Sequence, residues 1–352
     1  MADPEECIQE LLRGFTTYDR AVDVVSVFEM IFTASDTDLP GTVKHFERFP
    51  RVSQEDGDPL TPDFTILFDD QGGLVGEIAR IALRDESVES LCRQIAKYDG
   101  IKQLPDGSKE APTTHSDVLL LVPQTIGPAA VKRVITERAA NEDHWYQPAA
   151  FPCVVQFGYD EDRYTFQRLL EPLNGMPRDG DRPDGLSRWF EENGGFATRP
   201  ERFREIKAAR AFVNDPIDRL YLATHLWAKT FATEAGDAGG SGPVGLEVEP
   251  KEIAHTLREQ HGHVRKEDVI RALRLLKTAR LAEEQGGDEE RWVVAWEELR
   301  GRPGQPDKEL ARNLAARACK PPSSGPLDRL AAAKRPNKRA ARSLPERLPG
   351  LE

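Results

Sequence analysis

Residues 62–80 read PDFTILFDDQGGLVGEIAR, and the fold expected for this chain of 352 residues follows from them. Asp63–Phe68 is rich in apolar and β-branched residues, as strands are, and Leu74–Leu83 is a second run of this kind. Asp69–Gly73 between them consists of turn-forming residues. Two strand-like runs joined by a short turn predict a β-hairpin.

Two carboxylates are predicted to converge on this hairpin. With the turn centred near Gln71, Asp63 lies opposite about Ala79, which makes Asp63 and Glu77 diagonal neighbours on one face of the sheet. Carboxylates this close raise each other's pKa unless a cation lies between them. Because hard oxygen ligands suit Mg²⁺, or Mn²⁺ in its place, the hairpin predicts a metal site.

The neighbouring segments predict a mixed α/β domain over residues 1–160. The expected order is α-β-β-β-α-β-α-β, and the nearly continuous apolar run Asp117–Val122 is typical of a strand buried in the middle of a sheet. The other elements are expected at Arg20–Thr33 (helix), Val43–Val52 (strand), Ser87–Tyr98 (helix), 128–140 (helix) and Cys153–Phe157 (strand).

At these residues the chain resembles the PD-(D/E)XK nuclease superfamily, which has the restriction-endonuclease-like fold. The resemblance rests on Pro62-Asp63, on Glu77-Ile78-Ala79 and on the αβββαβ order over residues 20–125. Gln94 and Tyr98 on the next expected helix are similar to the Gln-x-x-x-Tyr element of one branch of the superfamily. The resemblance implies an α/β fold with a restriction-endonuclease-like mixed-sheet core.

The resemblance also implies a function, that of a metal-dependent DNA endonuclease. Asp63 and Glu77 are then ligands of Mg²⁺ or Mn²⁺, and Gln94 and Tyr98 position metal-bound water or phosphate. Nucleases joined to DNA-binding modules serve in restriction or phage defence, which extends to this chain by analogy of fold alone. The plainer alternative is that Asp63 begins a strand, Glu77 pairs with a surface arginine, and Gln94 and Tyr98 are ordinary helix residues.

Glu29 is a candidate third metal ligand. On a helical wheel it falls between Val22 and Val25, in the apolar stripe that also holds Phe28 and Phe32. A buried acid needs a partner, and in the superfamily a carboxylate of the first helix often completes the metal site. The alternatives are that Glu29 accepts a hydrogen bond in the core or lies at its edge.

One position departs from the family pattern. The family has a lysine two residues after the second acid, where it orients and deprotonates the attacking water, but Ala79 stands there. Arg80 is expected on the opposite face of the strand and is a poor base. Lys97, expected towards solvent, and Lys44, next to His45, are the other candidates. An active nuclease and a catalytically degenerate nuclease-fold subunit that binds DNA or protein therefore both stay open.

The second half of the chain predicts a further domain. Residues 161–233 are expected to form a charged helical extension, residues 234–245 a Gly-rich linker, and residues 246–299 a small α+β domain. Helices at Asp215–Thr233, Pro250–Gln260 and Lys266–Ala282, followed by a hairpin-like segment up to Trp296, resemble a winged helix-turn-helix domain.

The third of these helices is a candidate DNA-binding element. Its basic residues are Arg271, Arg274, Lys277 and Arg280, and such a helix can enter a major groove. Residues 283–290, EEQGGDEE, follow it with five acids, which would repel phosphate. DNA contact therefore competes with protein contact or self-association through this domain.

Residues 300–352 are expected to be a flexible, Pro-rich basic tail. Lys334, Arg335, Lys338 and Arg339 form an arm of the kind that follows a phosphate backbone without reading sequence, and a purely solubilising tail is the alternative. Residues 301–352 carry 12 Lys and Arg against 5 Asp and Glu, so this segment has a charge of +7. The whole chain has −12, which leaves −19 for residues 1–300. DNA binding is therefore expected to depend on the tail and on metal.

Composition excludes other classes. The apolar runs are too short to cross a membrane, and the acidic N-terminus lacks the pattern of a secretory signal. The scattered residues Cys7, Cys92, Cys153 and Cys319 suggest neither a zinc site nor a disulfide framework. A cytoplasmic protein is expected.

Overall fold

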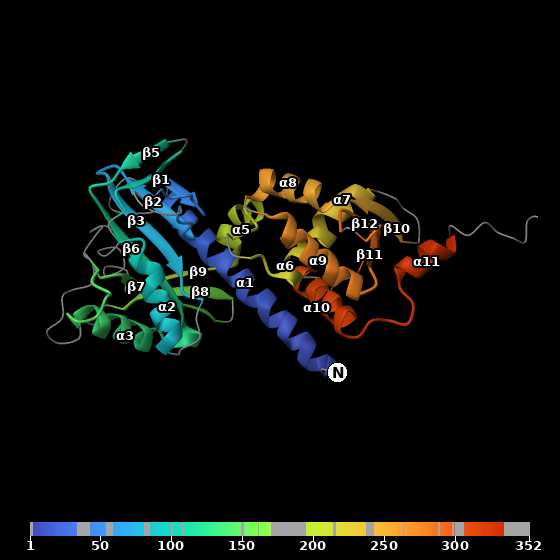
Figure 1. Ribbon diagram of the computed structural model, residues 1–352, viewed down its shortest axis with the longest axis horizontal. Coiled ribbons are helices and arrows are strands. Elements are labelled where there is room, and N and C mark those ends of the chain that lie inside the picture. The colour runs from blue at the N-terminus through green and yellow to red at the C-terminus, as the bar shows by residue number, and fades with distance from the viewer. Residues whose placement is uncertain are drawn as a thin grey trace, which may run out of the picture. The chain divides into compact units, whose positions relative to one another are not determined.

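The structure, a computed structural model, describes residues 3–33, 43–53, 59–80, 85–99, 101–107, 109–148, 151–160, 162–169, 195–213, 216–236, 243–262, 264–287, 289–297, 299 and 306–333. It is a mixed α/β structure that divides into two compact units (Figure 1). The sheet unit comprises Asp19–Asp215 with Gln260–His263, and the helical unit comprises Met1–Tyr18, Pro216–Glu259 and Val264–Glu352.

A seven-stranded sheet in the order β1-β2-β3-β6-β7-β8-β9 forms the centre of the sheet unit. β1, β2 and β3 are antiparallel neighbours, β6 and β7 run parallel to β3, and β8 and β9 are antiparallel again. The strands are β1 (Val43–Arg48), β2 (Phe64–Phe68), β3 (Gly72–Ile78), β6 (His115–Pro123), β7 (Cys153–Asp160), β8 (Arg163–Arg168) and β9 (Phe196–Thr198).

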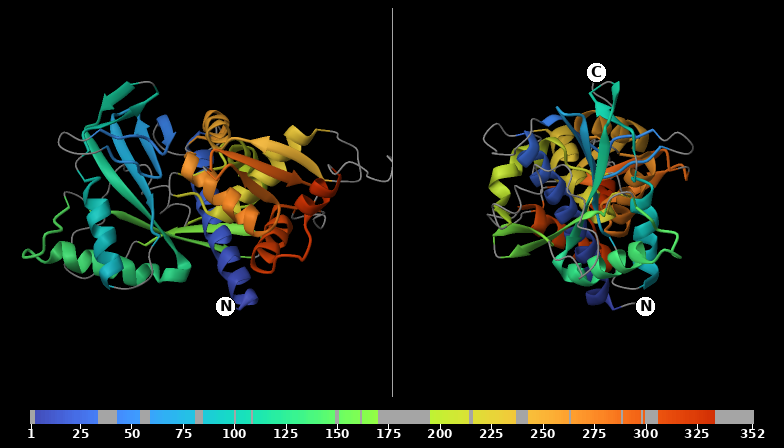
Figure 2. Two further views of the ribbon diagram at one scale, coloured as in Figure 1. Left: turned by 45° about the vertical axis from the view of Figure 1, so that its right-hand side comes forward. Right: turned by 90° about the vertical axis from the view of Figure 1, so that its left-hand side faces the viewer.

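Helices cover both faces of this sheet (Figure 2). The second half of α1 (Pro4–Thr33) packs on one face, where Phe28 stacks on Phe64 and meets Phe166 edge to face. On the other face, α2 (Asp85–Ala96) and α3 (Pro128–Ala140) share a buried apolar cluster with the strands, which includes Val88, Leu91, Ile95, Val131, Ile135, Val75, Leu120, Val122 and Val154. The sequence of elements up to β7 is the expected one, with a hairpin of β4 (Gln103–Asp106) and β5 (Lys109–Pro112) and a short 3₁₀ helix η1 (Gln124–Ile126) added.

The predicted hairpin is β2–β3, but its register differs from the prediction. Phe64 lies opposite Gly76, and the Asp63 N–H donates to the Gly76 carbonyl at 3.1 Å, so Asp63 lies beside Glu77 instead of opposite Ala79. The reason is a shorter loop. Gln71 adopts a left-handed φ of 66° and closes a three-residue connection of a type common in hairpins.

A long helical segment that begins at Arg219 forms the centre of the helical unit. It runs through α6 (Arg219–His225), a π-helical turn η2 (Leu226–Thr230) and α7 (Phe231–Ala235), and the Asp218 carboxylate caps its start. The unit also contains α8 (Pro250–His261), α9 (Lys266–Thr278), α10 (Pro306–Cys319), α11 (Pro326–Ala333) and an antiparallel sheet in the order β10-β12-β11, with β10 (Val244–Val248), β11 (Ala282–Gln285) and β12 (Arg291–Trp296).

The charged segment 161–233 is only partly the helical extension that was expected. It contains α5 (Pro200–Ala209) and the helix at Arg219, but it also supplies β8 and β9 to the main sheet. In β8, the buried side chains of Tyr164 and Phe166 alternate with more exposed residues. This period of two is the sequence feature that indicates a strand within the charged segment. The Gly-rich segment 234–245 ends in a strand, because β10 begins at Val244.

The tail 300–352 is not wholly flexible, contrary to expectation. It contains α10 and α11, and α10 buries a stripe of small and aliphatic residues: Leu310, Ala311, Leu314, Ala315 and Ala318. Each alanine buries little apolar area, so this stripe gives only a weak amphipathic pattern in the sequence. Its role in packing becomes visible only in the folded unit, where neighbouring elements cover it. Residues 334–352, with the predicted basic arm, lie outside the described residues.

A disulfide joins Cys7 of α1 to Cys319 of α10, with 5.9 Å between their Cα atoms. The expectation of no disulfide is therefore wrong, because this pairing depends on how α1 and α10 pack and not on cysteine spacing. Cys92 and Cys153 are buried and are not part of this disulfide. Within the described ranges, no helix combines the length and the hydropathy that crossing a membrane requires.

Candidate functional site

The acid pair of the hairpin, Asp63 and Glu77, is buried at the open end of β2 and β3. Each residue is only 4% exposed. Glu77 belongs to the same strand face as Val75, which packs in the apolar cluster under α2. Two carboxylates in such a place need donors or a cation, since burying bare charge is costly.

Arg80 supplies that cation. Its Nη2 donates to Asp63 Oδ1 at 2.6 Å, its Nη1 lies 3.2 Å from Asp63 Oδ2, and the same Nη1 is 3.8 Å from Glu77 Oε1. The expectation that Arg80 points to the opposite face is wrong. β3 ends at Ile78, so strand alternation no longer sets the direction of the Arg80 side chain.

Further donors complete the surroundings of the acids. The Ile78 N–H donates to Asp63 Oδ2 at 2.7 Å. Gln94 Nε2 donates to Glu77 Oε1 at 2.5 Å, and the Tyr98 hydroxyl donates to Glu77 Oε2 at 3.0 Å. Burial, and then the nearby Glu77 carboxylate, raise the pKa of Tyr98, so its hydroxyl stays a donor at all ordinary pH values. The four residues predicted to act together, Asp63, Glu77, Gln94 and Tyr98, are thus brought together.

The candidate lysines lie elsewhere. Lys97 is exposed, as its position on the helical wheel predicts. Lys44 stands at the other end of the hairpin from Asp63, since Val43 pairs with Phe68, and its Nζ lies 2.6 Å from Asp106 Oδ2. Ala79 is buried in the apolar cluster. The cation next to the acid pair is therefore the guanidinium of Arg80, the residue that follows Ala79.

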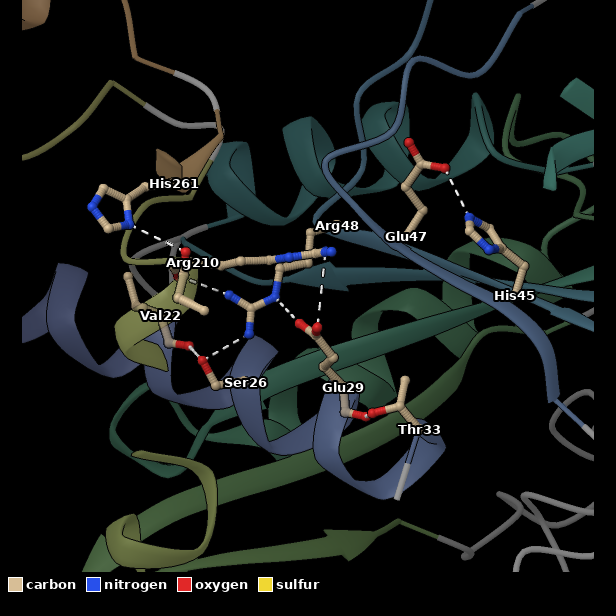
Figure 3. Close-up of polar contacts among 10 residues, drawn as sticks. Val22, Ser26, Glu29, Thr33, His45, Glu47, Arg48, Arg210 and His261 are labelled. Atoms are coloured by element: carbon tan, nitrogen blue, oxygen red, sulfur yellow. Dashed lines mark hydrogen bonds and ion pairs between the residues drawn. The ribbon is translucent and has the colours of Figure 1, made fainter. Parts of the chain in front are cut away.

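Glu29 is not brought to the acid pair. It forms an ion pair with Arg48 Nε, and Arg48 also donates to Ser26 Oγ at 2.8 Å and to the Arg210 carbonyl at 2.9 Å (Figure 3). Arg48 pairs with Phe64 and faces α1, whereas Glu77 faces α2, so the sheet separates the two groups. Among the described residues no three His, Cys, Asp or Glu side chains gather where they could hold a metal. Glu29 is thus a partly buried ion-pair partner here, with its side chain 13% exposed.

The acid pair fits a divalent cation in charge and in ligand chemistry. Two buried carboxylates offer hard oxygen ligands, and Gln94 and Tyr98 hold one of them in place. The position between the carboxylates is taken by the Arg80 guanidinium, which offsets one of their two negative charges. A metal ion can use these ligands only after Arg80 moves.

The basic residues of α9 lie against acids of the same unit. Arg274 lies 2.6 Å from Glu289, Lys277 is 3.1 Å from Glu284, and Arg271 pairs with Asp268. Glu284 and Glu289 belong to the hairpin segment of β11–β12 that was expected to repel phosphate. Arg280 donates to the Ser323 carbonyl at 2.6 Å. The hairpin therefore pairs with Arg274 and Lys277, two of the basic residues that were predicted to bind DNA.

A second ionic cluster, partly buried, was missed by sequence reasoning. Lys207 of α5 lies 2.6 Å from both Asp19 and Asp23 of α1, and the Tyr164 hydroxyl donates to Asp23 at 2.6 Å. Burial raises the pKa of Asp23, and Lys207 opposes that shift. The only signal in the sequence is an i, i+4 pair of acids on an apolar helix, which does not identify its partner. The cluster joins α1, α5 and β8.

Searches of protein-family models, of curated proteins and of solved structures found no match to this chain.

Proposed function

We propose that the sheet unit is a metal-dependent nuclease that hydrolyses phosphodiester bonds in DNA. The observation that carries the proposal is the convergence of Asp63, Glu77, Gln94 and Tyr98 at one end of the β2–β3 hairpin. Asp63 and Glu77 come from the hairpin, Gln94 from the following helix and Tyr98 from the turn after that helix, which is close to the arrangement that the PD-(D/E)XK resemblance implies. The antiparallel β1-β2-β3 group and the parallel β6 next to it support a restriction-endonuclease-like core.

Each residue has a proposed part. Asp63 and Glu77 hold Mg²⁺ or Mn²⁺, and Gln94 and Tyr98 fix the orientation of the Glu77 carboxylate by donating to its two oxygens. When bound, the metal supplies Lewis acidity and an activated water. Arg80 replaces the charge of the family's lysine, but its guanidinium does not deprotonate, so it stabilises negative charge and is not a base.

DNA is proposed to be attracted mainly by the tail. The sheet unit holds buried acids, and Arg274 and Lys277 of α9 are paired with acids of the β11–β12 hairpin. Lys334, Arg335, Lys338 and Arg339 belong to the segment of net charge +7. Deleting residues 334–352 is expected to flatten the salt dependence of DNA affinity, because fewer phosphate contacts release fewer counterions.

A cleavage assay tests the nuclease proposal. The full-length protein is incubated with plasmid and with single-stranded DNA in Mg²⁺ or Mn²⁺, beside Asp63→Asn and Glu77→Gln. Glu137→Gln, which changes an exposed carboxylate of α3, is the matched control. Metal-dependent cleavage that both site variants lose and the control keeps is the expected result. Cleavage that survives in Asp63→Asn and Glu77→Gln would contradict the assignment.

A second candidate is a metal-free binding subunit on a nuclease-like fold. The Arg80 guanidinium favours it, because the acid pair already has a cation at 2.6 Å. Calorimetry separates the two functions. A protein that binds DNA or a partner protein but takes up neither Mg²⁺ nor Mn²⁺, even with Arg80 replaced by alanine, is a binding subunit.

A further inference from the structure

Arg80 holds the place where a metal ligated by both acids has to lie. Its two terminal nitrogens contact both oxygens of Asp63, at 2.6 Å and 3.2 Å, and one of them also faces Glu77. This fork-like contact uses the geometry in which guanidinium groups bind carboxylates best. Asp63 is 4% exposed, so water competes weakly for it.

The guanidinium and a divalent ion exclude each other. A small divalent ion binds carboxylate oxygen at about 2.1 Å. An ion at that distance from Asp63 would lie within a few ångströms of the Arg80 nitrogens, where like charges repel strongly in a buried site. Metal binding therefore requires Arg80 to leave Asp63.

Arg80 is placed to leave when a better anion is offered. Its side chain is 27% exposed, whereas the acids beneath it are buried. It also follows the end of β3 by two residues, so its direction is not constrained by the strand. A phosphodiester presents two oxygens to a guanidinium in the way that a carboxylate does, and arginine is well suited to both.

We infer that Arg80 makes metal binding at Asp63 and Glu77 depend on a bound nucleic-acid phosphate. Without nucleic acid, Arg80 pairs with the acids, offsets one of their two charges, and the metal binds weakly. A backbone phosphate above the site draws the guanidinium outward, which frees the carboxylates for the metal and leaves Arg80 against the phosphate. Arg80 is thus a positioning residue that couples the two ligands. The inference rests on the proposed nuclease function.

Such coupling is reciprocal. If the oligonucleotide raises the affinity for the metal by a given factor, the metal raises the affinity for the oligonucleotide by the same factor. Coupling between two sites commonly amounts to about 5- to 150-fold, and a direct exchange of one cation for another is expected at about 10-fold or more. Removing Arg80 should abolish the coupling and leave the metal site open.

Calorimetric titration with Mn²⁺ tests the inference on the full-length protein, with and without a phosphorothioate oligonucleotide that resists hydrolysis. Wild type, Arg80→Ala and Arg80→Gln are compared. Arg133→Gln, at an exposed arginine of α3, is the matched control. The double variant Asp63→Asn/Glu77→Gln reports the Mn²⁺ that the oligonucleotide binds by itself.

The expected result is that the oligonucleotide tightens Mn²⁺ binding by about 10-fold or more in wild type and in the control. Both Arg80 variants should bind Mn²⁺ tightly without it and show no dependence on it. If one variant fails to fold, fluorescence anisotropy on the wild-type protein supplies a second measurement. Added Mn²⁺ must then raise the affinity for the oligonucleotide by the same factor by which the oligonucleotide raises the affinity for Mn²⁺.

Two results would overturn the inference, and only the second of them also refutes the nuclease proposal. Equal Mn²⁺ affinity of wild type with and without the oligonucleotide refutes the role of Arg80 and leaves the nuclease proposal intact. No Mn²⁺ uptake at the acid pair by wild type or by either Arg80 variant, with or without the oligonucleotide, refutes the nuclease proposal as well.

Discussion

Two groups of acids and arginines in this protein look alike in sequence and differ in environment. In the sheet unit, Asp63 and Glu77 are buried around Arg80, and their carboxylate oxygens accept from the protein. In the helical unit, Arg274 and Glu289 form a similar contact, at 2.6 Å, but the two side chains are 58% and 32% exposed. Distance alone does not distinguish the two groups.

Burial is what separates them. An exposed ion pair gains little, because water and salt already solvate both charges, and its side chains lose freedom when they pair. Water and salt do not reach a buried acid in this way, so removal of its partner leaves an unsolvated charge. The acid pair of the sheet unit is therefore sensitive to each of its contacts, and the paired surface of α9 is not.

The largest effect is expected from a contact that is not electrostatic. Since the ion pairs of α9 contribute little, the helical unit should depend more on the Cys7–Cys319 bond. The double variant Cys7→Ser/Cys319→Ser is expected to lower the free energy of unfolding by about 4 kcal/mol. Urea unfolding followed by fluorescence of Trp227, Trp292 and Trp296 measures it. A reductant should reproduce the loss in wild type and have no effect on the double variant.

Asp63→Ala comes next. It deprives Arg80 and the Ile78 N–H of their acceptor, and the expected loss is about 3 kcal/mol in the free energy of unfolding, reduced from the fully buried case because Arg80 is partly exposed. Urea unfolding in EDTA checks this value. A loss as small as that of an exposed control, Glu137→Ala, would contradict the claim that burial makes this pair sensitive.

Tyr98 adds a pH dependence. Burial and Glu77 raise its pKa above the ordinary value, so above pH 10 the unfolded chain loses the proton of Tyr98 while the folded protein keeps it. The unfolded state then binds fewer protons, and stability falls as pH rises. The slope contributed by this one tyrosine is about 1.4 kcal/mol per pH unit. Tyr98→Phe should remove that part of the slope, whereas Tyr159→Phe should keep it.

The smallest effect is expected on α9. Arg274→Ala or Glu289→Gln should change the free energy of unfolding by about 0.5 kcal/mol or less. The change should be smaller still in about 0.5 M salt, because salt at that concentration screens exposed charges strongly. A salt series of urea unfolding measures both. A loss comparable to that of Asp63→Ala would show that exposure is not what separates the two groups.

Much of the candidate site was predictable from local sequence. The hairpin follows from two strand-like runs around a turn, and the pairing of strands then requires Asp63 and Glu77 to meet. Gln94 and Tyr98 are four residues apart, which predicted one helix face for both; α2 ends at Ala96, and the turn that follows it carries Tyr98 to Glu77. These contacts join residues that are close in the chain, and they depend on the regular periods of the helix and the strand. Both can be read from the amino-acid sequence.

The remaining contacts were decided by how the elements pack. The side chain of Arg80 lies beyond the end of β3, where no period directs it, and only the charge of the folded acid pair draws it inward. Glu29 of α1 meets Arg48 because the sheet presents Arg48 on the face that α1 covers, away from the acid pair. Cys7 and Cys319 are 312 residues apart and meet only through the packing of α1 on α10.

The physical reason is the same in each case. Local pattern sets the direction of a side chain inside a helix or strand, and it assigned the paired carboxylates to one place, whereas the family resemblance added the glutamine and the tyrosine. Partners that join distant segments, or that lie just beyond an element, depend on burial and charge that exist only once the chain has folded. The residues therefore specified a cluster of acids, and the folded structure specified that an arginine is the cation within it.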